Sequence, residues 1–473
     1  MKTRTIRMTS SLIAAGMLVA SAPAMATNGY FTHGVGTQSK GMAGTGIGSN
    51  SDMGAIMSAS NPALGVFVSD QWEAGLSIFS PRRSYTAGES QLNGSLIDLG
   101  NGNFLPSHTI TPGKIDSSSE YFPIPYVAKN WSLANDGNIT FAFYGRGGMN
   151  TDWDDTNSSA TSYFCGGDPL QGEPPATGQG PYCAGEAGVD LSQAFVTFNY
   201  SAKVGDNFAW GIGPVFAFQM FEAKGVSTFI PITETFAASG GTELPTSLSD
   251  NGRDTSYGFG LALGLWWGVT DRVSLGLAYQ SRMEMSEFDD YSDLFAEQGG
   301  FDIPSSLKAG LSFLASETLR INFDIEHTAY SDVDSIGNPM SNMLPCPTLP
   351  FGGTSLANCL GGDLGAGFGW EDMTTYKLGF EWASDSKNIW RFGYSYGEQP
   401  IQAADVLFNI LAPGVMEQHF TLGWTHIRDN GGMWNVSFMY APENTVSGPS
   451  LFDPTQNIDL KMSQFEFEVS YRF

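Results

Sequence analysis

The chain has 473 residues, 58 of them glycine, and a formal net charge of −26. This acidity argues against nucleic acid as a partner, because DNA and RNA are polyanions. Beyond the N-terminus no run of about 18 apolar residues occurs, which argues against transmembrane helices. Two classes of protein remain: a set of soluble domains, or one large membrane barrel. A barrel is compatible with the composition, because its alternating strands give a mean hydropathy near zero.

The first 26 residues have the pattern of a secretory signal peptide. Three basic residues precede a short apolar stretch at 12–20, and a small-x-small cleavage pattern ends at Ala26. We therefore expect residues 1–26 to be removed and the mature chain to begin at Thr27.

Export also makes disulfides possible. The four cysteines are spaced as two local pairs, and we expect the bonds Cys165–Cys183 and Cys346–Cys359. Metal binding is the alternative, but the chain has no Cys-x-x-Cys, and no histidine lies near either pair in the sequence. We expect neither a metal nor a cofactor.

The segment 27–70 is rich in glycine and poor in charge. Between 27 and 65 the only formal charges are Lys40 and Asp52, and no strand-like or helical pattern is long enough to stand alone. Glycine costs backbone entropy and provides no side chain for a core. Such a segment is stable only when something encloses it, so we expect a short plug inside the remainder of the chain.

Residues 71–473 predict an all-β, transmembrane antiparallel barrel. Short turns containing Asp, Asn or Gly alternate with long polar connections, which is the layout of bacterial outer-membrane barrels. An even number of strands allows the two edges to pair and close. About fourteen strands are expected, at 72–78, 121–131, 139–149, 194–203, 208–221, 257–269, 273–285, 306–314, 319–328, 375–383, 389–396, 418–426, 433–440 and 461–473.

The two faces of these strands differ. In 257–267 large apolar residues alternate with Gly258, Gly260, Ala262 and Gly264, which leaves room inside the barrel, although such glycines can also relieve curvature. A secreted soluble sandwich also alternates, but aromatic residues near both strand ends favour two membrane-interface girdles. The last strand ends on Phe473, which resembles the C-terminal signature of outer-membrane proteins. That resemblance implies contact with the barrel-assembly machinery, membrane lipid and lipopolysaccharide.

Two motifs in the segment 27–70 carry a family resemblance. Gly29-Tyr30-Phe31 opens the mature chain, and Asn61-Pro62-Ala63 follows the glycine run just before the first strand. With the barrel pattern, they resemble the FadL-type long-chain fatty acid transporters of the bacterial outer membrane, which include carriers of aromatic hydrocarbons. The resemblance implies a monomeric fourteen-stranded barrel with an N-terminal plug.

The resemblance also implies a route. A hydrophobic ligand is caught among the outer loops, moves to a tighter site near residues 29–31, and leaves sideways through an inward kink in the third strand. Gly145, Gly147 and Gly148 lie in that strand, where glycine permits a bend, so we expect the lateral gate there. An ordinary strand end is the alternative.

Two outer loops contain apolar residues that could form the groove. These are Phe229, Ile232 and Phe236 in one loop, and Leu294 and Phe295 in another. Packing of these residues into a loop core is the alternative.

Three cations on predicted inward faces, Arg146, Lys308 and Arg320, could meet a carboxylate head group. Pairing with Asp324 or Glu326 is the alternative, and an uncharged substrate would need none of the three.

We therefore expect passive transport of hydrophobic molecules, with long-chain fatty acids first and alkanes or aromatic hydrocarbons as alternatives. A general porin would bring a loop into the lumen in place of an N-terminal plug. None of the five histidines lies in a nucleophile motif and no Gly-x-Ser-x-Gly occurs, so we expect no enzyme. An adhesive barrel is a third possibility, and acidic loop residues at 152–155 and 289–290 could bind calcium.

Overall fold

The structure is a computed structural model that describes residues 28–100, 103–134, 137–154, 156–347 and 352–473. The expected signal peptide and Thr27 lie outside these residues. In the described part of the chain, no helix is long and apolar enough to cross a membrane.

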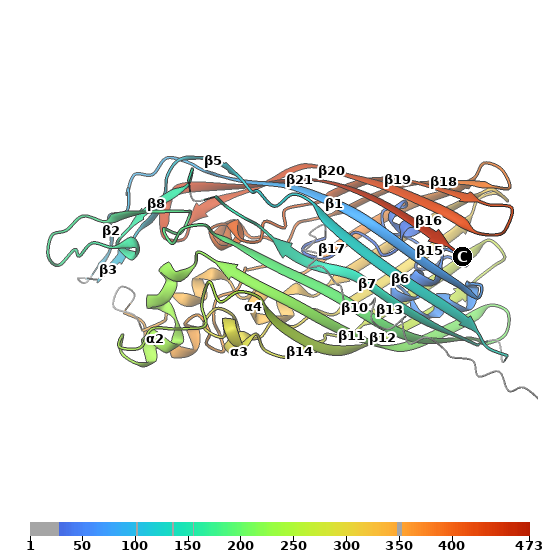
Figure 1. Ribbon diagram of the computed structural model, residues 1–473, viewed down its shortest axis with the longest axis horizontal. Helices are drawn as coiled ribbons and strands as arrows, with labels where there is room; N and C mark the ends of the chain where they lie inside the picture. The colour runs from blue at the N-terminus through green and yellow to red at the C-terminus, as the bar shows by residue number, and fades with distance from the viewer. Residues whose placement is uncertain (1–27, 101–102, 135–136, 155, 348–351) are drawn as a thin grey trace, which may run out of the picture.

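Fourteen antiparallel strands form a closed barrel (Figure 1). Each strand pairs with the next along the chain, and pairing of the first strand with the last closes the sheet. The strands are β1 (Gln71–Ala87), β6 (Phe122–Ser132), β7 (Gly137–Asn150), β10 (Gly188–Lys203), β11 (Phe208–Lys224), β12 (Asp254–Gly268), β13 (Val273–Gln280), β15 (Ser306–Leu314), β16 (Leu319–Thr328), β17 (Met373–Ala383), β18 (Asn388–Gly397), β19 (Gln418–Ile427), β20 (Met433–Ser450) and β21 (Asp453–Arg472).

The expected alternation of faces is confirmed. Leu263 and Leu265 of β12 are 41% and 42% exposed, whereas Ala262 and Trp266, which flank this pair in the sequence, are 6% and 5% exposed. Outward apolar side chains suit lipid contact, and closure of the sheet satisfies the strand hydrogen bonds that lipid cannot satisfy.

The prediction of a long loop between the last two strands, from 441 to 460, is wrong. β20 and β21 have 18 and 20 residues and continue beyond the barrel as one hairpin. A register shift between Ala441 and Asn444 interrupts the alternation of β20. A bulge moves side chains to the other face, so the pattern resembles a loop although the pairing continues.

The outer loops contain short elements. Two small sheets and several helical turns lie at the end opposite the short turns (Figure 1). One small sheet consists of β2 (Leu96–Gly100) and β3 (Asn103–Pro106), and the other of β4 (His108–Ile110), β8 (Ser159–Ser162) and β9 (Ala176–Gln179). Two further short strands pair with barrel strands: β5 (Gly113–Asp116) with β1, and β14 (Glu284–Met285) with β12. The helices are α2 (Glu234–Ala238), α3 (Ala296–Gly299) and α4 (Asp334–Gly337). The 3-10 turns are η3 (Tyr163–Cys165), η4 (Ser227–Ile232), η5 (Asp289–Tyr291), η6 (Tyr330–Asp332), η7 (Met340–Met343), η8 (Leu356–Asn358), η9 (Ala403–Asp405) and η10 (Phe408–Ile410).

The N-terminal segment, residues 28–70, contains α1 (Thr37–Lys40), η1 (Ala55–Ala59) and η2 (Pro62–Phe67). It lies within the ring of strands near the short turns (Figure 1). Most of its residues are buried, and it contacts strands from β1 round to β21. Lys40 forms an ion pair with Glu468 of β21 at 2.6 Å and also pairs with Glu466.

Inward-facing glycines allow the segment to approach the strand backbone. A methyl group built on Gly276 of β13 would lie 1.9 Å from the carbonyl oxygen of Ile47, and one on Gly423 of β19 would lie 3.0 Å from the Cα of Gly41. Larger side chains at these positions would collide with the segment. The glycines in such close contact include Gly211, Gly264, Gly276, Gly310, Gly379, Gly393 and Gly423.

The strands also satisfy the backbone of the segment. Asp324 of β16 accepts hydrogen bonds from the N–H groups of Gly46 and Ile47, at 2.7 and 3.0 Å. Trp266 and Ser274 both donate to the carbonyl oxygen of Gly48, at 3.0 and 2.7 Å. A buried backbone without regular structure needs such partners.

Asn61-Pro62-Ala63 has a structural role. The Asn61 amide donates to the carbonyl oxygens of Ile47 and Leu265, at 2.9 and 3.1 Å. Its side-chain oxygen accepts the N–H of Ala63 at 3.0 Å and so caps η2, while Pro62 occupies the first turn, where no N–H is needed. Asn61 therefore joins the N-terminal segment to β12 and also begins η2, the last turn of the segment.

We expect Gly276→Leu to displace the N-terminal segment and to destabilise the protein by about 2 kcal/mol, the usual effect of overpacking. The readouts are thermal unfolding and trypsin cleavage after Lys40, which is only 5% exposed in the native protein. Leu277→Ile, on the lipid-facing side of the same strand, is the control and should change neither. Equal protection of Lys40 in Gly276→Leu and the native protein would contradict the packing described above.

Candidate transport site

An apolar cavity lies among the outer loops. It has an empty volume of about 470 Å³ and includes Phe229, Leu294 and Phe295 from the groove expected from the sequence. Ile232 is buried and Phe236 half-buried, and neither lines this cavity. The other residues that line it come from separate segments, so no local sequence pattern brings them together: Val189, Phe221, Val226, Ser335, Leu360, Ala366, Gly367, Phe368, Phe408 and Leu411.

Aromatic side chains connect this cavity with the N-terminal segment. The ring centroids of Phe221 and Phe295 are 4.7 Å apart, and those of Phe295 and Phe301 are 4.9 Å apart. Phe301 lies 6.3 Å from Tyr30, which packs on Phe31 at 4.6 Å. These spacings are typical of interacting rings, so the rings form a continuous apolar chain.

Residues 29–31 sit in a closed aromatic cluster. Tyr30 is fully buried, 5.3 Å from Tyr330 and 6.0 Å from Trp370 between ring centroids. Gly29 has a φ of 63°, and a methyl group on it would lie 2.6 Å from the Tyr330 ring. Glycine is required there both by conformation and by the close approach.

The pairing of β6 with β7 stops part of the way along β7. It runs from Ser132↔Asn138 to Tyr126↔Tyr144, although β7 continues to Asn150. The part of β6 that does not pair with β7 contains Pro123 and Pro125, which lack an N–H. In the described structure, residues 145–150 of β7 therefore do not pair with β6.

The N-terminal segment occupies this free edge of β7. Phe31 forms an isolated antiparallel bridge with Gly147. The N–H of Thr32 donates to the carbonyl oxygen of Arg146, and the N–H of Gly148 donates to that of Tyr30, both at 2.9 Å.

A bulge marks the same place on the opposite side of β7. The pairing with β10 shifts register between Gln193 and Ala194, so that Arg146 is the extra residue between Gly145 and Gly147. A bulge bends a strand and increases its twist. The glycines expected at the lateral gate thus lie at a bulge, next to residues 29–31.

A group of buried charges reaches Phe31 through Arg146. Glu326 of β16 lies 3.5 Å from Arg146, 3.0 Å from Lys308 and 2.6 Å from Lys377. The Arg146 guanidinium also stands 4.5 Å from the centre of the Phe31 ring. Three cations therefore share one carboxylate.

Two other charges expected from the sequence are placed differently. Arg320 donates to Ser312 at 2.9 Å and is not part of this group. Asp324 accepts backbone N–H groups of the N-terminal segment, so it is engaged there. Lys377 was not among the cations proposed for the head group, although it is on the polar face of an alternating strand. A smaller cavity of about 240 Å³ borders Arg146, Gln280, Ser306 and Lys308.

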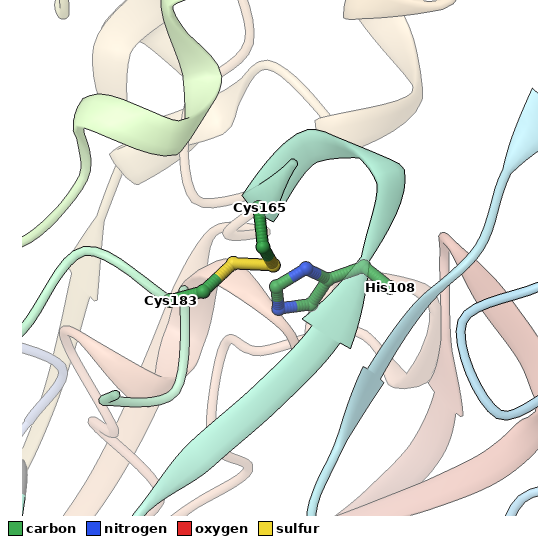
Figure 2. A group of neighbouring side chains, drawn as sticks. All are labelled: His108, Cys165 and Cys183. Atoms are coloured by element: carbon green, nitrogen blue, oxygen red, sulfur yellow. A yellow bond between two sulfur atoms is a disulfide. The ribbon is translucent and has the colours of Figure 1, made fainter. Parts of the chain in front are cut away.

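Two disulfides tie the outer loops, Cys165–Cys183 and Cys346–Cys359. Figure 2 shows the ring of His108 against the first of them. Burial lowers the pKa of His108, and one of its ring nitrogens lies 2.8 Å from the carbonyl oxygen of Pro181. Because both sulfurs are in a disulfide, this group provides no thiolate ligand for a metal.

Comparison with known proteins agrees with this arrangement. The family model described as "Outer membrane protein transport protein (OMPP1/FadL/TodX)" matches residues 176–450, more than half of the chain. No curated protein matches the sequence significantly.

Solved structures show the same fold. The Pseudomonas putida toluene transporter TodX is 15% identical, covers 93% of this chain and 98% of its own, and has a TM-score of 0.59. A Pseudomonas aeruginosa FadL homologue is 14% identical, with 94% and 99% covered and a TM-score of 0.59. The Ralstonia pickettii toluene transporter TbuX is 15% identical, with 93% and 98% covered and a TM-score of 0.53. The chain is therefore a β-barrel of the bacterial outer membrane and belongs to the OMPP1/FadL/TodX family of transport proteins.

Proposed function

We propose that this protein carries long-chain fatty acids passively into the outer membrane and releases them sideways. The ligand enters the outer cavity at Phe229 and Phe295, follows the aromatic chain to Tyr30 and Phe31, and leaves between β6 and β7. The observation that carries this proposal is that β7 beyond Tyr144 does not pair with β6. The N-terminal segment pairs with it there instead.

A side exit suits the chemistry of the substrate. Each methylene group kept out of water is worth about 0.8 kcal/mol, so a long acyl chain gains by remaining in apolar surroundings throughout. The aromatic chain supplies such surroundings from the outer cavity to β7, and the membrane lies beyond the strand.

The N-terminal segment is proposed to act as plug and gate together. Its body, about residues 33–70, is held by ion pairs and many hydrogen bonds to the strands, and would block the bore. Its first residues pair with β7 through two backbone hydrogen bonds, each worth about 1 kcal/mol net. A bound ligand could displace such a short pairing and open the edge of β7.

The charges around Glu326 favour a fatty acid as the substrate. Arg146, Lys308 and Lys377 exceed the one carboxylate that they share. A buried excess of positive charge is costly and is relieved by a ligand carboxylate.

Aromatic hydrocarbons are the second candidate. The rings from Phe221 to Phe31 favour them, and two of the structurally similar proteins are named as toluene transporters. A hydrocarbon would leave the cations around Glu326 without a function in binding.

Cross-linking Phe31→Cys to Gly147→Cys should abolish uptake, because the disulfide holds the N-terminal segment on β7. The two residues form a non-hydrogen-bonded pair, whose Cα atoms are typically about 4.5 Å apart and within disulfide range. Uptake of labelled palmitate is measured in the oxidised and reduced states.

Each single cysteine variant and the native protein, treated in the same way, are the controls. Reduction should restore uptake in the double variant alone. Full uptake by the oxidised, cross-linked protein would rule out this gate.

Lys308→Met should lower palmitate uptake about tenfold and leave toluene uptake unchanged, because only the fatty acid uses the charge. Glu326 keeps Arg146 and Lys377 as partners in this variant. Lys387→Met, which removes an exposed ion pair with Asp429, is the control. Equal loss of both substrates, or loss of neither, would contradict a head-group role for Lys308.

A further inference from the structure

We propose that Arg83 forms a second, separate binding site for the carboxylate of the substrate, on the exit side of the route. The proposal rests on the fatty acid function above and adds where the head group is held while the acyl chain leaves.

Arg83 is a buried cation without a counter-ion. It is 3% exposed, and no carboxylate of the described residues forms an ion pair with it. One of its terminal nitrogens donates to the carbonyl oxygen of Ser119 at 3.4 Å, and the other has no hydrogen-bond partner in the described structure. Its neighbour Arg82, on the outward face of β1, is paired with Glu120.

Arg83 also lines a cavity. It is small, with an empty volume of about 200 Å³. Asn150 also lines it, and its side-chain oxygen has no partner in the described part of the chain. The cavity is lined by Arg83, Met149, Asn150, Trp370, Ala412, Pro413 and Gly414.

The chemistry of this cavity fits a carboxylate. An isolated buried charge is strongly unfavourable, and a guanidinium in particular matches the two oxygens of a carboxylate. The side-chain amide of Asn150 can rotate by half a turn, which places its nitrogen where its oxygen was. It can then add an N–H donor, since the oxygen and nitrogen are nearly equivalent in shape.

The position of the cavity connects it with the exit. Met149 and Asn150 lie on β7 beyond the point where its pairing with β6 ends. Trp370 also lines the cavity and packs on Tyr30, with their ring centroids 6.0 Å apart. A ligand that moves from Tyr30 towards the edge of β7 therefore passes this cavity.

Arg83 also lies at the end of the apolar band of β1. Ile78 is 40% exposed to the outside, whereas Arg82, four residues further along, carries a charge on the outer face. A fatty acid with its carboxylate at Arg83 would thus have its head group near the membrane interface while its tail enters lipid.

The test is photolabelling of the full-length protein, in detergent micelles, with a palmitate analogue that carries a diazirine next to its carboxyl group. Labelled peptides are identified by mass spectrometry. We expect labels at residues 149–150 and 411–414 in addition to residues 29–31. Arg83→Gln should reduce the first set at least tenfold and leave the labels at 29–31 in place.

Three controls make the result specific. Arg83→Lys should keep part of the labelling, Arg82→Gln should keep all of it, and the methyl ester of the probe should not label 149–150 or 411–414. Arg83→Gln removes an unpaired buried charge, so we expect it to fold, and thermal unfolding checks this.

Labels at 29–31 without labels at 149–150 or 411–414 would overturn this inference and leave the proposed function intact. So would labelling of 149–150 and 411–414 that is the same in native protein and Arg83→Gln. A native protein that takes no label anywhere would overturn the fatty acid function itself, and this inference with it.

Discussion

A fourteen-stranded barrel encloses more space than its own inward side chains can fill, and the rest of the structure follows from how this space is occupied. Eight strands enclose a bore that side chains can fill, but larger barrels leave a lumen. Here the N-terminal segment lies within the ring of strands, and inward-facing residues of the strands contact its backbone. Glycines on seven strands permit contact, as Gly276 does with Ile47, and Asp324, Trp266 and Ser274 satisfy groups that would otherwise be buried without partners.

The same segment links the lumen with the side of the barrel. Its glycine-rich body is anchored near the short turns, whereas its first residues reach the edge of β7 that β6 does not cover. One piece of chain therefore lies inside the ring of strands and also covers the edge of β7. In the proposed function, a ligand that competes for this edge would leave the anchored body of the segment in place.

Much of the fold could be predicted from the sequence because period-two alternation and turn residues are local signals. The fourteen strands, their outward faces and the room left by glycines such as Gly264 all follow from them. The β20–β21 hairpin was missed because the bulge near Ala441 disturbs the alternation. The cavity and the group around Glu326 needed tertiary structure, since their members come from distant segments. Arg83 is an extreme case, because it is notable only for having one guanidinium nitrogen without a hydrogen-bond partner among the described residues.

Single-channel conductance of the native protein in a planar lipid bilayer tests whether the N-terminal segment blocks the bore. If the N-terminal segment fills the bore and the route is apolar, the reconstituted protein passes almost no steady ionic current. Large, stable open steps like those of a general porin would show a continuous aqueous channel, and would contradict both the enclosed segment and the sideways route.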